Sequence, residues 1–210
     1  MARRYMRKLL FTLSSALFLL SACSEAPKTA EKKKEEKAEP ITGQSALFKM
    51  YQMARSWAPD CQPLKMNSIP LSEVPTVPPG TAAAWQATFV SAARSQARSY
   101  TYSIVESTGN LHKGAFAGTE EGWSGGRGLN TPFPMLAVKV DTDAAYKTAL
   151  ENGGAEYDKK NPGKPISFVL EKVAKYPDSV WRVIWGESVG TSNFSIYVDT
   201  ATGEFKEKLR

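Results

Sequence analysis

The segments SVWRVIWGES (179–188) and FSIYVDT (194–200) decide the fold of this chain. Both are rich in aromatic and β-branched residues and are bounded by glycine and serine, a pattern that predicts β-strands. The short link between them suits antiparallel neighbours. We expect Asp199 to Gly203 to form a hairpin loop, because an Asp side chain accepts backbone hydrogen bonds at a turn and glycine adopts positive φ at little cost.

A helix and another strand precede these two segments. DTDAAYKTALENGGAEYDKK (141–160) predicts a helix that begins at Asp141 or Thr142 and is weakened or broken at Gly153-Gly154. PISFVLEKV (165–173) then supplies the first strand of a three-stranded antiparallel meander. These elements define a predicted unit over residues 131–210.

The preceding part of the chain repeats this order. QSALFKMYQMARSW (44–57) has apolar residues at helical spacing, and Pro59 ends the pattern. PLKMNSIPL (63–71), a turn-rich stretch with four prolines, AAWQATFVSA (83–92) and SYTYSIVES (99–107) follow, and the last two predict strands. Trp85-Gln-Ala-Thr-Phe is similar to Trp181-Arg-Val-Ile-Trp, so residues 41–108 are predicted to be a first copy of the same unit.

The predicted fold class is therefore α+β, with two repeats of a helix plus a three-stranded antiparallel meander. Each helix would cover one face of its own sheet. The alternative is one continuous sheet with both helices on the same side. The sequence does not choose between these two arrangements.

The second unit resembles a known family. Trp181-Arg182-Val183, the strand that ends at Tyr197-Val198-Asp199 and Thr202-Gly203-Glu204 resemble the C-terminal half of PepSY domains, although the tyrosine lies one residue closer to the aspartate than in the family. Residues 45–110 contain a fainter copy, and the whole is similar to duplicated PepSY-like lipoproteins of environmental Gram-negative bacteria. PepSY domains occur in propeptides of secreted metallopeptidases and in envelope proteins, and some hold peptidases inactive. The resemblance thus implies a binding or inhibitory role, without naming binding residues.

The predicted strands of the second unit contain three large aromatic residues, Trp181, Trp185 and Tyr197. In such a strand-rich unit, large aromatic side chains lie in the core more often than they contact a ligand. We therefore expect all three to be core residues.

The N-terminus is predicted to be an export signal over residues 1–22. Four basic residues precede an apolar run that is too short for a membrane span, which needs about 20 apolar residues. The run ends in Leu20-Ser21-Ala22-Cys23, which resembles a lipobox, so Cys23 is the predicted lipidation site. The alternative is an ordinary signal with a chance cysteine. A lipidated Cys23 would place the domain in the bacterial envelope facing the periplasm, and Ser24 slightly favours the outer membrane over the inner one.

Charge and cysteine content constrain the exported part. The signal contains four of the 27 basic residues and none of the 21 acidic ones, so the remainder carries a net charge of +2 and gives no support for a nucleic-acid partner. Residues 23–40 form a charged segment without large apolar side chains and are predicted to be a disordered tether. Cys61 then has no partner in the chain and is expected to be buried.

The chain lacks the usual residues of a catalytic or metal site. It has one histidine, His112, and its only cysteine besides the predicted lipidation site Cys23 is Cys61. We therefore expect no metal and no cofactor. Gly122-Trp123-Ser124-Gly125-Gly126 matches the G-x-S-x-G pattern of hydrolases, but no histidine lies downstream of it. We therefore assign no catalytic residue and predict that the protein is not an enzyme.

The segment between the two units has an unusual composition. Residues 109–130 are predicted to be a glycine-rich connecting loop that contains Trp123 and Arg127. Loops of this length are uncommon unless they are functional or disordered, and Trp and Arg are frequent interface anchors. We hypothesise that Trp123 and Arg127 bind a protein or peptide partner, the alternative being a hairpin with Trp123 packed on the domain. The favoured function is a membrane-anchored periplasmic binding module that restrains or binds a peptidase or a peptide. A structural or assembly lipoprotein is second, and a hydrolase is third.

Overall fold

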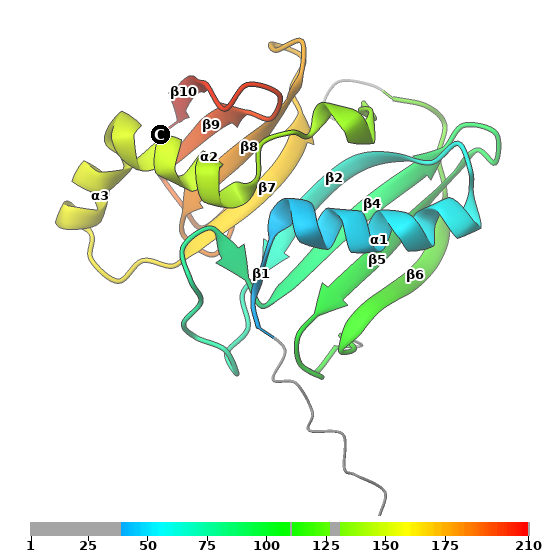
Figure 1. Cartoon of the computed structure of the whole chain (residues 1–210), viewed down its shortest axis with the longest axis horizontal. Coiled ribbons are helices and arrows are strands. Elements are labelled where there is room, and N and C mark those ends of the chain that lie inside the picture. The colour runs from blue at the N-terminus through cyan, green and yellow to red at the C-terminus, as the bar shows by residue number, and fades with distance from the viewer. Residues whose placement is uncertain (1–38, 110, 127–130, 210) are drawn as a thin grey trace, which may run out of the picture. The chain divides into compact units, whose positions relative to one another are not determined.

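The computed structural model of this chain describes residues 39–109, 111–126 and 131–209 (Figure 1). The predicted signal over 1–22, the lipidation site Cys23, most of the tether 23–40 and Arg127 lie outside these residues. The described residues all belong to one compact unit. Within the described residues, none of the helices has both the length and the apolar character required to cross a membrane.

An antiparallel sheet is the centre of the fold. In the described residues its strand order is β10-β9-β8-β7-β2-β4-β5-β6, and a two-stranded sheet pairs β1 with β3. The strands are β1 (Ile41–Thr42), β2 (Gln62–Ile69), β3 (Thr81–Ala82), β4 (Ala84–Ser91), β5 (Gln96–Ser103), β6 (Gly114–Gly122), β7 (Ile166–Lys172), β8 (Ser179–Trp185), β9 (Ser195–Asp199) and β10 (Phe205–Leu209). The helices are α1 (Gly43–Trp57), α2 (Thr142–Ala149) and α3 (Ala155–Lys160).

Both main helices, α1 and α2, cover the same face of this sheet (Figure 1). The apolar faces of the two helices, represented by Leu47 and Ala145, belong to one buried core together with Trp85 and Trp181. The predicted α+β class is therefore confirmed. Of the two arrangements that the sequence allowed, the structure has the continuous sheet with both helices on one side.

Each half of the sheet has four strands where the sequence predicted three. The additional strands are β6 and β10, so residues 114–122, expected within a connecting loop over 109–130, instead pair with β5. The strand signal in β6 is weak because glycine stands at every fourth residue, 114, 118 and 122, and most of its side chains are exposed, which removes the apolar alternation. In β10 the lysines and glutamate of FKEKL have the same effect.

The first turns of the two helices are joined by shared caps. The Asp141 side chain, at the N-cap of α2, accepts the Thr142 N–H at 2.7 Å and also the Gln44 N–H of α1 at 2.8 Å. Thr142 Oγ1 accepts the Gly43 N–H at 2.8 Å. Because the N-cap residue Thr42 makes no side-chain cap of its own, α1 depends on α2 for the partners of its first amides.

The helical segment 141–160 is interrupted where the sequence predicted. Asn152 and Gly153 leave helical geometry, with φ of +112° at Gly153, and a wide turn links α2 to α3. A Cβ on Gly154 would lie 2.4 Å from the Trp185 ring. Glycine is thus needed at 153 for the backbone conformation and at 154 for the close approach of the indole.

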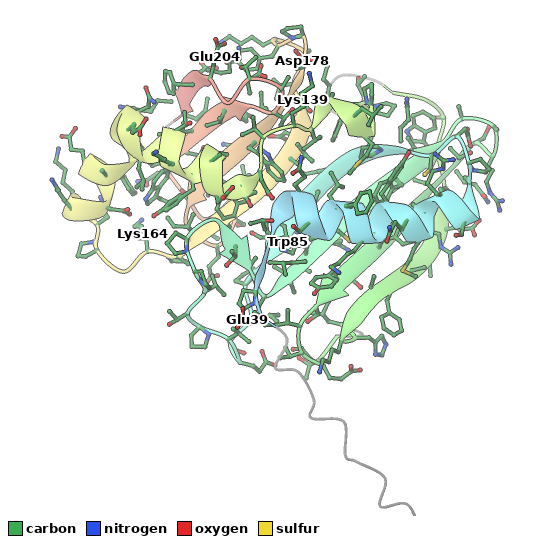
Figure 2. All side chains as sticks on the ribbon, in the orientation of Figure 1. Glu39, Trp85, Lys139, Lys164, Asp178 and Glu204 are labelled. Carbon is green, nitrogen blue, oxygen red and sulfur yellow. The ribbon has the colours of Figure 1, made fainter. Side chains whose placement is uncertain are left out.

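Two tryptophans fix the helices to the sheet in the same manner. Trp85 Nε1 on β4 donates to Ile41 O at 3.1 Å, close to the start of α1 (Figure 2). Trp181 Nε1 on β8 donates to Val140 O at 2.8 Å, just before α2. The two indole rings meet edge to face with centroids 6.5 Å apart. Each half of the sheet thus makes the same indole-to-carbonyl hydrogen bond to the start of its own helix.

The predicted hairpin loop between β9 and β10 is confirmed. Asp199 Oδ1 accepts the backbone N–H groups of Ala201 at 2.8 Å and Thr202 at 3.0 Å, and Gly203 has φ of +78°. Lys206 Nζ lies 3.2 Å from Asp199 Oδ2. Although burial alone would raise the pKa of Asp199, these N–H donors and the ammonium group hold it below its ordinary value.

Candidate binding surfaces

The sheet ends in two edge strands that differ in how they resist further pairing. Strand β10 is short, contains a register shift after Phe205, and carries Lys206 and Lys208. Short length, irregularity and lysine are the features that keep an edge strand from pairing with another chain. The β10 edge is therefore well protected.

Strand β6 has less protection. It is nine residues long, has no strand beyond it among the described residues, and is uncharged from Gly114 to Thr119. It also contains a bulge after Ala117. Phe116 is 43% exposed and its ring lies 4.6 Å from that of His112. The charged end of β6 is engaged, because Glu120 contacts Arg98 at 3.4 Å and Arg94 at 3.5 Å. Arg98 Nε also donates to the Gly118 carbonyl at 2.9 Å, so the uncharged edge that remains before the bulge is Gly114 to Ala117.

Trp123 directly follows β6. Its backbone N–H donates to Ser95 O at 2.9 Å, and the half-buried residue lines a surface pocket together with Ala92 and Ser95 of the turn between β4 and β5. The indole N–H is buried and has no hydrogen-bond partner in the described structure. The structure thus places Trp123 at one end of the β6 edge, whereas its predicted companion Arg127 lies outside the described residues. Their role in partner binding remains a prediction.

A cleft opens at the middle of the sheet, where β2 meets β7. These strands pair only from Lys65–Glu171 to Asn67–Val169, although β2 continues to Ile69 and β7 begins at Ile166. Beyond the last pair, the Phe168 N–H donates to the Ser68 side chain at 2.9 Å rather than to a backbone carbonyl. The two halves of the sheet therefore separate at this end.

One wall of this cleft is the proline-rich strap, which we define as residues 70–80 between β2 and β3. The cleft measures about 680 Å³. It is lined by residues 68–72 and 74–83, Tyr146, residues 165–168 and Glu187. Two contacts hold the strap: Ser107 donates to Glu73 at 2.7 Å, and Thr142 Oγ1 donates to the Gly80 carbonyl at 2.5 Å. The first of these bonds also lowers the pKa of the Glu73 carboxyl.

The predicted core aromatics lie in two different places. Trp181 and Trp185 are fully buried beneath the helices, as expected. Tyr197 is also buried but points to the opposite face, since its neighbours Ile196 and Val198 face the core and side chains alternate along a strand. There its hydroxyl donates to Glu171 at 3.0 Å. Burial and that carboxylate raise the pKa of Tyr197 to about 12.

Cys61 is buried, as the sequence predicted. Burial raises the pKa of its thiol to about 11, so at neutral pH it is protonated and a poor nucleophile. His112 is half-buried, with Nδ1 2.6 Å from Glu106 Oε1. In the described ranges no group of three or more His, Cys, Asp or Glu residues could hold a metal ion. Ser124, of the G-x-S-x-G match, is exposed after β6.

No protein-family model matches this chain, and no curated protein gives a significant match. Structure comparison does find a similar fold, in the crystal structure of a putative lipoprotein from Clostridium difficile 630. The TM-score is 0.50 at 9% identity, and the match covers 83% of this chain and 95% of the other. At this identity the likeness shows the shared fold alone.

Proposed function

We propose that this protein is a lipid-anchored binding module of the bacterial envelope that faces the periplasm and takes a strand of a protein or peptide partner at β6. The anchor would be Cys23 after removal of residues 1–22, with the outer membrane slightly favoured. The lipobox-like residues 20–23 support it, as does the name of the similar Clostridium difficile structure. The tether 23–40 would separate the domain from the lipid surface.

We also propose that the domain is a duplicated PepSY-like fold. Each half has a helix followed by four strands in antiparallel order, running outward from the β2–β7 contact. The matched indole bonds, from Trp85 to Ile41 and from Trp181 to Val140, support the equivalence of the halves. The hairpin at Asp199 has the hydrogen bonds expected for the family-like motif.

The observation that carries the binding role is the contrast between the two edges. Strand addition uses the free backbone groups of an edge strand, and it requires that the strand be long enough and free of blocking charges. The β6 edge meets these conditions from Gly114 to Ala117, before the bulge and before the Gly118 carbonyl that accepts from Arg98, whereas β10 has Lys206 and Lys208. Restraint of a peptidase is the specific version of this role, and family resemblance alone suggests it.

A matched pair of variants tests the proposal. Phe116 on β6 and Phe205 on β10 are exposed to similar extents, 43% and 40%. The domain, residues 37–210, is used as bait for crosslinking in envelope extract, followed by mass spectrometry. We expect Phe116→Lys to remove the crosslinked partner and Phe205→Lys to leave it, because only the first places a charge on the receiving edge.

The identity of the partner then separates the functions. A crosslinked peptidase whose activity falls on addition of the domain supports restraint. Co-purification with envelope assembly machinery supports an assembly role. Equal capture by both lysine variants, or turnover of a substrate by the domain alone, contradicts the proposed binding at β6.

A further inference from the structure

The cleft beside the proline-rich strap is distant in the sheet order from β6, since it opens between the central strands β2 and β7. Its volume of about 680 Å³ lies within the roughly 300–1,000 Å³ that ligand sites occupy. Its walls include the side chains of Val74, Val77 and Ile166 and the ring of Tyr146. An apolar occupant is therefore favoured over a polar one.

Backbone geometry at the cleft suits a peptide more than a lipid. The Phe168 N–H points toward β2, and because backbone direction alternates along a strand, the amide and carbonyl of Ile166 also point into the gap beyond the last β2–β7 pair. An extended peptide has the alternating donors and acceptors needed to bond there, whereas an acyl chain has none. The wall of the strap adds few donors, because prolines at 70, 75, 78 and 79 lack an N–H.

Charge at the rim points to a positively charged group on the occupant. Glu187 is the one acidic or basic residue that lines the cleft, and it forms no ion pair within the described residues. Lys164 directly precedes the cleft residues 165–168 (Figure 2), but its ammonium group lies over the Tyr157 ring, 5.7 Å from the centroid. An anionic ligand would face an unneutralised carboxylate.

We infer that this cleft binds a short extended peptide segment with apolar side chains and a positive charge beside Glu187. The site is separate from β6 and does not depend on the proposed function. Hydrogen bonds to β7 would hold the peptide backbone, and the apolar walls, including the strap, would contact its side chains.

The test uses residues 37–210, which contain the core and the paired strands that the structure describes. Three synthetic probes are added, and binding is followed by amide NMR. The probes are acetyl-Val-Ile-Val-Lys-amide, acetyl-Val-Ile-Val-Glu-amide and acetyl-Ser-Asn-Ser-Lys-amide. We expect saturable binding of the first, with shifts confined to residues 68–83, Tyr146, residues 165–168 and Glu187. The second should bind about fivefold more weakly, as an exposed ion pair implies, and the third should not bind.

Four variants assign the site. Val77→Asp should abolish binding of the apolar lysine probe, and Glu187→Gln should bring the lysine and glutamate probes to nearly equal affinity. Phe116→Lys and Leu136→Asp, the latter at a side chain that is 87% exposed, should leave binding unchanged. Absence of saturable binding by the unmodified domain overturns the inference, as do shifts that map to β6. Loss of binding in Phe116→Lys would assign the peptide to the β6 edge instead, and would leave the proposed function standing.

Discussion

Asp141 is the residue whose loss should most clearly reveal how the two helices depend on each other. Its carboxylate accepts one N–H in the first turn of α2, at 2.7 Å, and one in the first turn of α1, at 2.8 Å. Replacement of a capping side chain by alanine costs about 0.5–2 kcal/mol for one helix. Because Asp141→Ala removes a cap from both helices, we expect a loss of about 2–3 kcal/mol in the free energy of unfolding.

Urea denaturation of the domain measures this loss. With a slope of about 1–3 kcal/mol per molar urea, the midpoint should fall by roughly 1 M. Asp143→Ala is the matched control, since Asp143 lies in the same first turn but, within the described part of the chain, its side chain bonds only to the adjacent Ala144 N–H at 2.7 Å. Its midpoint should change by less than half as much. Equal effects of the two variants would show that the bond from Gln44 to Asp141 contributes nothing, and would refute the shared cap.

Three further predictions concern single residues. The pKa of Asp199 is lowered in the folded state, so its carboxylate should stabilise the fold above the unfolded pKa of about 3.9. This stabilisation should be lost as the pH falls through the folded pKa. The difference in unfolding free energy between the unmodified domain and Asp199→Asn should therefore shrink below about pH 4. Gly203→Ala should cost about 1 kcal/mol, because φ is +78° there, while Gly122→Ala, at an open position with ordinary φ, should cost nothing measurable in urea denaturation. Cys61 should resist a thiol reagent at pH 8 in the native domain and react once urea unfolds it, because its pKa is about 11 and its side chain is buried.

The sequence predicts those elements whose side chains are committed to the core. In β8 and β9 nearly every residue is buried, so apolar and aromatic residues dominate and the strands are visible in the sequence. The helix over 44–57 is equally clear, since Leu47, Met50 and Ala54 are buried at helical spacing. Strand β6 is held mainly by its backbone hydrogen bonds to β5. Because almost every residue type can make such bonds, they leave no pattern of side chains in the sequence.

The sheet arrangement and the cleft depend on contacts that no local pattern encodes. The pairing of β2 with β7 joins segments about one hundred residues apart, and it rests on three residue pairs. The cleft then combines a strap, one residue of α2, the start of β7 and Glu187. The prolines of the strap indicate a turn-rich segment in the sequence. The strap becomes the wall of a cleft because β2 and β7 stop pairing at Asn67–Val169, before either strand ends.

The two halves of the domain differ in features that their shared architecture does not require. If the halves are copies, as we propose, β6 corresponds to β10, and the strap between β2 and β4 corresponds to residues 173–178 between β7 and β8. In the second half, the edge strand β10 is short and carries lysines, and the connection over residues 173–178 is also short. That half forms its four strands without a long edge strand or a long strap. The nine-residue strand β6 and the proline-rich strap are therefore features of the first half alone. Under the proposal both serve binding, which would explain why β6 keeps an uncharged stretch from Gly114 to Ala117 although an exposed strand edge carries a risk of aggregation.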